Sequence, residues 1–443
     1  MSFFRNIKSL LYFASPIILG QLAQMLIGAG DVFVAARHGA NTVASISIAN
    51  AIITIIFVGG FGMLLSISPV LSKMRGEKAD INRFLNFTLI YSAILAFIVM
   101  LVCMSIIWAI PYMGFEKTLV ANIQEYIYIC SFSFLGAYIY NTLKEFLQSY
   151  EKVLFANIIA VLAIFLNLLI GWVLVFGFAF IPSIGVKGLA ISTVIVRSLM
   201  GLALVAYCHK FFTKEFYFDK QYLKRLVNIG YPMSLSLLLE LSAFSTITLL
   251  SGKIGTIQVA ANSIVFTFVS LTFMIPLAIS DALGVRMGYA YGARNYHIMK
   301  DNLIAALSLS LFVMSIFALI FLIFPQSLMS IFSADKKVIF TGTGLLFIAA
   351  LFQIFDGVQI TLSGALRGLG STKPISFTML FSYWFIGLPI GIYLAFAKKL
   401  EIYGLWIGLA IALFVCVLIF SLALLRKLKK HFIDFQVIHK SIL

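Results

Sequence analysis

Twelve apolar segments, each long enough to cross a lipid bilayer, constrain what this chain can fold into. They begin near residues 12, 43, 84, 120, 154, 186, 226, 258, 302, 340, 376 and 402. A helix of about 20 apolar residues spans the ~30 Å hydrocarbon core, because each residue rises 1.5 Å. Only 11% of the residues are charged, whereas soluble domains carry roughly 25%. We therefore expect an all-α polytopic membrane protein with twelve transmembrane helices.

The basic residues in the loops predict the orientation of the chain. With twelve spans both termini lie on one side, and the loops and tails of that side hold 23 of the 32 Lys and Arg residues. The opposite loops hold 8, and Arg197 lies inside a span. Cytoplasmic loops are enriched in Lys and Arg, so we expect both termini in the cytoplasm. This distribution also accounts for the net charge of +16 without nucleic acid as a partner.

The two halves of the chain repeat each other at a constant spacing of 216 residues. Pairs at this spacing are Pro16 and Pro232, Gly39 and Gly255, Ser47 and Ser263, and Gly76 and Gly292. A polar, basic connector from Cys208 to Arg225 separates the halves. We predict two six-helix bundles, residues 1–215 and 216–443, and an even number of spans makes the repeats parallel. Transporters place their binding sites near the midplane, between or within such repeats.

Four acidic residues lie inside the predicted spans, where a charge is costly and usually marks an ion or substrate pathway. Glu240 is the only ionisable residue near the middle of its apolar segment, and Asp356 shares one helical face with Gln353, Gln359 and Ser363. Such an oxygen-rich strip suits a hard monovalent cation or a proton. Each acid alone could be a hydrogen-bonded packing residue. We favour function for Glu240 and Asp356 together, and leave open whether Asp281 acts with them or pairs with the basic segment at Arg286.

The first half offers a second polar group. Gln24 and Asp31 are seven residues apart on one face of the first span, and Asn167 and Thr193 lie inside the fifth and sixth spans. Side chains of this kind also join membrane helices by hydrogen bonds. Arg197, one turn after Thr193, could neutralise Asp31, reach the membrane interface or hold an anionic group.

Signatures of enzymes are missing from the sequence. It contains no glycine-rich phosphate loop, no HExxH and no CxxC, and its histidines lie in predicted loops or the tail. We expect no cofactor and no catalytic residue, so any transport would be driven by an ion gradient rather than by ATP bound to this chain.

Several motifs resemble the multidrug and toxic compound extrusion (MATE) family, and in particular its bacterial NorM-like branch. They are the spacing of Pro16, Gln24 and Asp31, the pattern GxxxxxSPxxxxxxG from Gly62 to Gly76, IGYPMSLSLLLEL at Glu240, PLAISDALGVRMGYAYGARN from Pro276, and FQIFDGVQITLSGALRGLGSTKP from Phe352. The resemblance covers essentially the whole chain. It differs at Gly171, where many relatives have Asn or Asp, and at Arg197, which adds a positive charge.

The resemblance implies two bundles around a V-shaped central cavity in the bacterial inner membrane. It also implies export of cationic, amphipathic drugs or toxins against inward Na⁺ or H⁺, by a protein that we expect to be a monomer among membrane lipids. Carried over by position, Glu240 and Asp356 are the cation site, holding Na⁺ if Na⁺ is the coupling ion, and Asp31 is a protonatable acid. Gln24, Asn167 and Thr193 support Asp31, with Gln353, Gln359 and Asp281 in the second half and Arg197 as a substrate-cavity candidate.

An alternative interpretation is a flippase for a lipid-linked sugar or another anionic amphiphile, on a related scaffold. Arg197 would then bind the anion, and the acids would be structural. Twelve spans and the lack of an intramembrane cluster of Lys and Arg disfavour it. A membrane receptor or scaffold is a third class, but the chain has no appended domain through which to signal.

Overall fold

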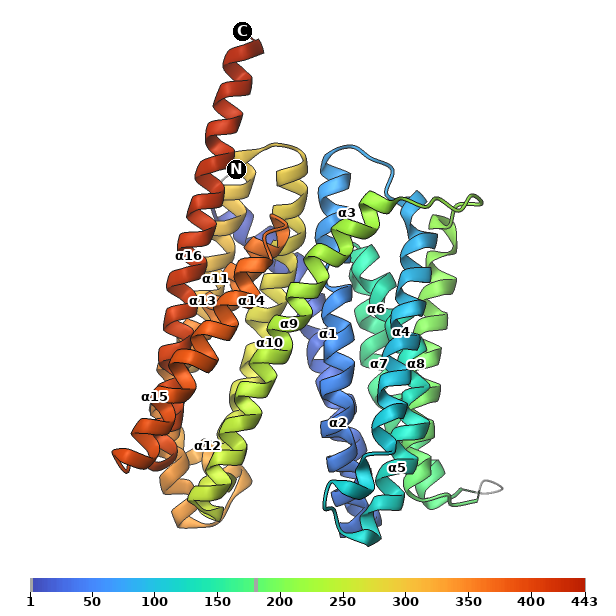
Figure 1. Ribbon diagram of the computed structural model, residues 1–443, viewed down its shortest axis with the longest axis vertical. Helices are drawn as coiled ribbons and strands as arrows, with labels where there is room; N and C mark the ends of the chain where they lie inside the picture. The colour runs from blue at the N-terminus through green and yellow to red at the C-terminus, as the bar shows by residue number, and fades with distance from the viewer. Residues whose placement is uncertain (1–2, 179–181, 443) are drawn as a thin grey trace. The chain divides into compact units, whose positions relative to one another are not determined.

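The computed structural model describes residues 3–178 and 182–442, with side chains except at positions 40, 117 and 431–442 (Figure 1). In chain order the α-helices are α1 (Phe3–His38), α2 (Ala40–Leu64), α3 (Ile67–Gly76), α4 (Leu85–Ile107), α5 (Lys117–Ser131), α6 (Ser133–Ser149), α7 (Leu154–Phe176), α8 (Val186–Cys208), α9 (Lys220–Ile254), α10 (Thr256–Gly292), α11 (Tyr296–Ile323), α12 (Pro325–Phe332), α13 (Lys336–Gly368), α14 (Lys373–Met379), α15 (Leu388–Ile392) and α16 (Glu401–Ile442). Short 3₁₀ turns η1 (Asn82–Phe84), η2 (Ile110–Tyr112) and η3 (His209–Phe211) join some of them, and η4 (Leu380–Gly387) and η5 (Tyr393–Ala397) are π-helical.

Among the described residues, eleven helical segments are long and apolar enough to cross a membrane. They correspond to eleven of the twelve segments predicted from the sequence. The segment near residue 120 is instead two shorter helices, α5 with 15 residues and α6 with 17. The break falls at Phe132, and both helices pack against α4 and α8. The all-helical membrane architecture is therefore confirmed, with one predicted span interrupted near its middle.

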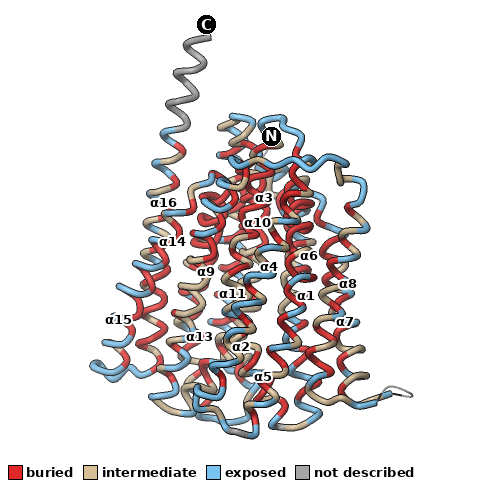
Figure 2. Tube along the Cα trace, turned by 45° about the vertical axis from the view of Figure 1, so that its right-hand side comes forward, coloured by how far each residue is buried: buried red, intermediate tan, exposed pale blue. Residues whose placement is uncertain are grey.

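The burial pattern follows from the composition of the segments. Buried and exposed positions alternate along most helices (Figure 2), as expected for helices that contact other helices on one side. Phe97, Leu169, Phe312 and Leu425 are large apolar side chains with exposed fractions between 55% and 65%. Exposed apolar residues on such long helices suit contact with lipid chains.

The chain folds into two compact units. One, called unit 1 here, comprises residues 1–18, 72–78 and 231–443; the other, unit 2, comprises residues 19–71 and 79–230. The boundary predicted at residues 215 and 216 lies in the connector between α8 and α9. The division into two functional bundles at that point, and the central cavity between them, stay predictions.

Backbone geometry recurs at the spacing of the sequence repeat. Lys78 and Arg294, 216 residues apart, both have positive φ angles, of 63° and 53°. Gly185 and Glu401, again 216 apart, have φ angles of 58° and 49°. Side chains other than glycine rarely adopt this conformation, so its recurrence at one spacing is what a duplicated helical unit predicts.

Within unit 1, α10 and α13 approach each other through small residues. A Cβ atom added to Gly364 would lie 2.3 Å from Ser280 Oγ and 2.4 Å from the Ser280 carbonyl oxygen. A Cβ at Gly368 would lie 2.5 Å from the carbonyl oxygen of Gly284. Small residues four apart allow membrane helices to pack with their backbones close together. This contact fixes how α13 is placed against α10, and α13 carries Asp356.

We expect Gly364→Ala to lower the free energy of unfolding by about 1–3 kcal/mol, because the new methyl group overpacks the contact between α10 and α13. Gly28→Ala is the matched control, since a Cβ at Gly28 has nothing within 4 Å. The measurement is the thermal unfolding midpoint of each purified variant. Equal midpoints for the two variants would contradict the close packing at Gly364.

Candidate cation-coupling site

Two acidic side chains from different helices of unit 1 come together beside a buried tyrosine. Glu240 lies on α9 and Asp356 on α13, and their carboxyl groups are close enough to interact electrostatically. The hydroxyl of Tyr383 donates a hydrogen bond of 3.4 Å to Glu240 Oε1. Tyr383 and Asp356 are 0% and 4% exposed. The sequence predicted that the two acids act together, and the fold brings them together.

The cause of this meeting lies partly in the π-helical stretch η4, which contains Tyr383 and Trp384. Trp384 Nε1 donates to the carbonyl oxygen of Leu239, at 3.3 Å, one residue before Glu240. Single π-helical turns inside helices are frequent at functional sites. Here two consecutive aromatic residues of η4 hold the same turn of α9.

The oxygen-rich strip predicted around Asp356 is buried in unit 1. Gln353, Gln359 and Ser363 are 0%, 0% and 3% exposed. Gln359 Nε2 donates to the sulfur of Met379 at 3.7 Å. In the part of the chain that the structure describes, the side-chain amide of Gln353 has no hydrogen-bond partner. Neutral oxygens beside two carboxylates are donors that a hard monovalent cation accepts.

Asp281 has a different environment. Arg367 Nη2 on α13 lies 2.6 Å from Asp281 Oδ1, and the two side chains are only 7% and 6% exposed. The sequence analysis considered a pairing with the basic segment at Arg286, whose guanidinium donates to the hydroxyl of Ser9 at 2.9 Å. The ion-pair partner seen in the structure is Arg367, which the sequence analysis counted among the loop residues.

Unit 2 contains a second buried polar cluster around Asp31. Thr193 Oγ1 on α8 donates to Asp31 Oδ2 at 3.2 Å, in competition with the carbonyl oxygen of Leu189 at 3.1 Å. Asn167 Nδ2 on α7 donates to Ser192 Oγ at 3.3 Å, and the Ser192 hydroxyl donates to the carbonyl oxygen of Asn167 at 3.1 Å. Asn167 also lies near enough to Asp31 to act on its carboxyl group. Three of the predicted residues therefore meet here.

Gly171, where the sequence differs from many MATE relatives, leaves room for Ser192. A Cβ atom at Gly171 would lie 3.6 Å from Ser192 Oγ and 3.2 Å from Leu189 Cδ2. The polar group beside Asn167 thus comes from α8 instead of α7. The sequence pattern gave no sign of this exchange, because it depends on how the two helices are packed.

Arg197 is held inside unit 2 by side chains from two other helices. Its Nη1 donates to Ser133 Oγ on α6 at 3.0 Å, and its guanidinium carbon lies 5.3 Å from the centre of the Phe57 ring on α2. It is also near enough to Asp31 to act on that carboxyl group. Of the three roles considered for Arg197, this geometry fits a counter-charge for Asp31.

Gln24 lies apart from that cluster. It is two helical turns before Asp31 on α1, and its side chain lies beside the hydroxyl of Tyr140. The prediction that Gln24 and Asp31 share a helix face therefore places them on one helix without placing them in one contact group.

Two buried polar residues were missed by the sequence analysis. Tyr383 stands in the aromatic run FSYWF, which gives no sign that its hydroxyl reaches Glu240. Glu145, 5% exposed on α6, is a fifth buried acid and accepts a hydrogen bond from Ser68. Its neighbour Lys144 is 4% exposed, and this charged pair near a helix end resembled a loop. A break in the predicted span was the only available signal.

Comparison with known proteins identifies the family. The family model MatE matches residues 16–173 and 232–393, which together are most of the chain. The chain belongs to the MatE family. It is similar to the probable multidrug resistance protein NorM of Mesorhizobium japonicum, with 30% identity over 428 residues, 93% of this chain and 92% of that protein. The NorM protein of Photorhabdus laumondii is 27% identical over 436 residues and 96% of both chains.

The fold agrees with solved structures of MATE transporters. The crystal structure of the Vibrio cholerae MATE transporter VcmN in the bent form superposes with a TM-score of 0.89 at 19% identity, over 97% of this chain and 98% of that one. The protein is thus a NorM-like, multi-pass membrane transporter of the MATE family and not an enzyme.

Proposed function

We propose that this MATE transporter exports cationic, amphipathic drugs or toxins in exchange for Na⁺ or H⁺. The observation that carries the proposal is the buried pair of acids, Glu240 and Asp356, on two helices of unit 1. Among the described residues no Lys or Arg forms an ion pair with either of them. The names of the NorM relatives, which are multidrug resistance proteins, support the same activity.

Competition at these acids explains how exchange would work. A buried carboxylate without a basic partner is costly as a free anion. It is therefore expected to hold a proton, a Na⁺ ion or a cationic substrate in each state. If the coupling ion and the substrate compete for it, each favours the release of the other, and the differential affinity of the two conformations sets the direction. One charge crossing 100 mV adds about 2.3 kcal/mol to this drive.

The roles of the two clusters differ in this proposal. Glu240 and Asp356 bind the coupling cation, with Gln353 and Gln359 as neutral donors. Asp31 has its own positive neighbour in Arg197, so we assign it a supporting, protonatable role. Asp281 is assigned a structural role because Arg367 already neutralises it.

We also propose that both termini face the cytoplasm of a bacterial inner membrane and that the monomer is sufficient for transport. The excess of Lys and Arg on the side of the termini supports this orientation. The buried positions of Lys144 and Arg367 remove two residues from that count and leave the excess large. A protease-accessible tag at residue 443 in sealed spheroplasts would contradict the orientation.

Substrate efflux from proteoliposomes tests the coupling. A Na⁺ gradient at constant pH, or a pH gradient without Na⁺, is imposed on vesicles loaded with a cationic dye. We expect one of the two gradients to drive efflux, and Asp356→Asn to abolish it. Efflux driven by Na⁺ assigns Na⁺ to Glu240 and Asp356. Efflux driven only by pH makes Glu240 or Asp31 the proton carrier. If neither gradient moves the dye, the proposal fails, and a flippase for an anionic amphiphile becomes the better hypothesis.

A further inference from the structure

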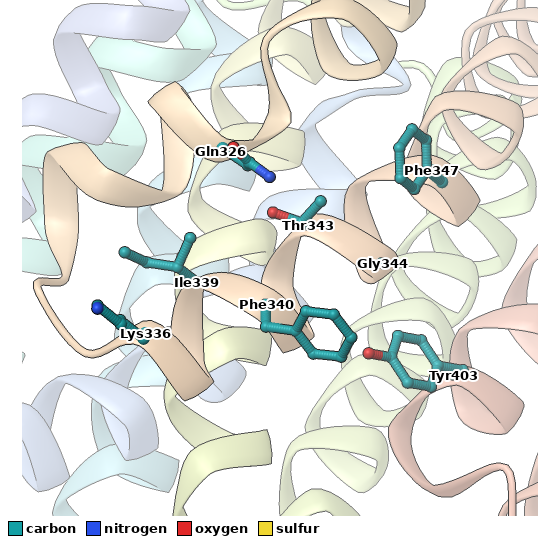
Figure 3. Close-up of a pocket in the computed structure, with 8 residues that line it drawn as sticks. All are labelled: Gln326, Lys336, Ile339, Phe340, Thr343, Gly344, Phe347 and Tyr403. Carbon is teal, nitrogen blue, oxygen red and sulfur yellow. The ribbon is translucent and has the colours of Figure 1, made fainter.

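Unit 1 contains a pocket that the proposed transport function does not use. It has a volume of about 450 Å³ and lies between α12, α13 and the beginning of α16 (Figure 3). Its lining includes Gln326, Lys336, Phe340, Thr343, Phe347 and Tyr403. None of these residues belongs to the clusters around Glu240, Asp356 or Asp31.

The wall of the pocket is built by a close contact between two helices. A Cβ atom at Gly344 of α13 would lie 2.7 Å from Tyr403 Cε1, so the missing side chain lets the Tyr403 ring lie directly against α13. The Tyr403 hydroxyl donates to the carbonyl oxygen of Thr341 at 3.3 Å. Both lone pairs of that hydroxyl are left as acceptors, and the ring is fixed as one face of the pocket.

One end of the pocket is polar and positively charged. Lys336 is the first residue of α13, Gln326 the second of α12 and Tyr403 the third of α16. These polar groups thus come from the beginnings of their helices, where a spanning helix meets water. In the described part of the chain, no carboxylate forms an ion pair with Lys336.

The two acids at these helix beginnings are engaged elsewhere. Asp335 accepts a hydrogen bond from the backbone N–H of Lys337 at 2.8 Å. Glu401 accepts one from Gln258 Nε2 at 2.8 Å. The charge of Lys336 is therefore available to a ligand.

The other end of the pocket is apolar and lies deeper along α13. Phe340 and Phe347 are 77% and 49% exposed, although they are aromatic. Together with Lys336 they form one stripe of α13, at spacings of four and seven residues. Eleven residues of helix from Lys336 to Phe347 correspond to about 16 Å. The Thr343 hydroxyl lies between them, and among the described residues it has no hydrogen-bond partner.

We infer that this pocket binds one anionic phospholipid, with its phosphate at Lys336 and an acyl chain along Phe340 and Phe347. The order of the groups, from cation to hydroxyl to aromatic rings, runs from the membrane surface into the hydrocarbon layer as a phospholipid does. A cationic drug would be repelled by Lys336, and the headgroup ammonium of a zwitterionic lipid would oppose it. With the orientation proposed above, the lipid belongs to the outer leaflet of the membrane.

Native mass spectrometry of the purified full-length protein tests this site. Phosphatidylglycerol and phosphatidylcholine are titrated separately against wild type, Lys336→Ala and the neighbouring control Lys337→Ala. A lysine near the membrane surface contributes ~1 kcal/mol toward an anionic lipid, so Lys336→Ala should weaken phosphatidylglycerol binding about fivefold. Lys337→Ala, which does not line the pocket, should leave it within about twofold of wild type. Equal phosphatidylglycerol binding by wild type and Lys336→Ala would overturn the inference.

A spectroscopic measurement locates the lipid. In Phe347→Trp, reconstituted in bilayers, dibrominated phosphatidylglycerol should quench the added fluorescence more strongly than dibrominated phosphatidylcholine. The difference should disappear in Phe347→Trp/Lys336→Ala, and inorganic phosphate should not compete. Equal quenching by the two lipids, or displacement by phosphate alone, would contradict a lipid site. Neither measurement involves transport, so the result is independent of the proposed antiport.

Discussion

Cells that rely on the Asp356→Asn or Glu240→Gln variant for drug efflux are expected to be nearly as drug-sensitive as cells without the transporter. Each substitution keeps the shape of the side chain and removes the negative charge that the coupling cation or the substrate requires. Because the two acids lie together on α9 and α13, neither is expected to replace the other. We expect transport to fall more than tenfold, equivalent to a loss of over about 1.4 kcal/mol in cation binding.

The measurement is the minimal inhibitory concentration of a cationic dye, normalised to transporter abundance in the membrane. Asp301→Asn is the matched control, because it removes a carboxylate on α11 that the structure places outside both clusters, where it accepts only a long hydrogen bond from Asn6 at 3.5 Å. It should protect cells as wild type does. If Glu240→Gln and Asp356→Asn also protected cells fully, the assignment of the coupling site would be wrong.

Arg367→Met is expected to lower the free energy of unfolding by about 3–5 kcal/mol, because it leaves the Asp281 carboxylate buried without its cation. The pair is separated by 2.6 Å, and both side chains are almost completely buried. The double variant Asp281→Leu/Arg367→Met should recover most of this loss, since it removes both charges and fills the space with apolar groups. Thermal unfolding midpoints in detergent, monitored by fluorescence, measure both effects.

Lys373→Met provides the control for this prediction. Lys373 is an exposed cation at the beginning of α14, six residues after Arg367. Exposed cations contribute little to stability, so its midpoint should stay close to that of wild type. An Arg367→Met protein as stable as Lys373→Met would show that Asp281 does not depend on its ion pair. A double variant no more stable than Arg367→Met would mean that the pair also specifies how α10 and α13 fit together.

The sequence by itself determined the membrane architecture and the location of the acids along it. Length and hydropathy are local properties, so they predicted eleven of the spanning segments directly. The spacing of 216 residues predicted the repeat, and the positive φ angles of Lys78 and Arg294 recur at it. The motif resemblance gave the family, which the match to the MatE model confirms.

Only the tertiary structure decided which side chains meet. The contact between Tyr383 and Glu240 joins residues 143 positions apart, and the pair of Asp281 with Arg367 joins residues 86 apart. The same holds for Ser192, which reaches Asn167 because Gly171 leaves room for it. Hydropathy and periodicity report which face of a helix is polar, but they contain no information on the rotation and translation of one helix against another. Those depend on the close packing of distant small residues, such as Gly364 against Ser280.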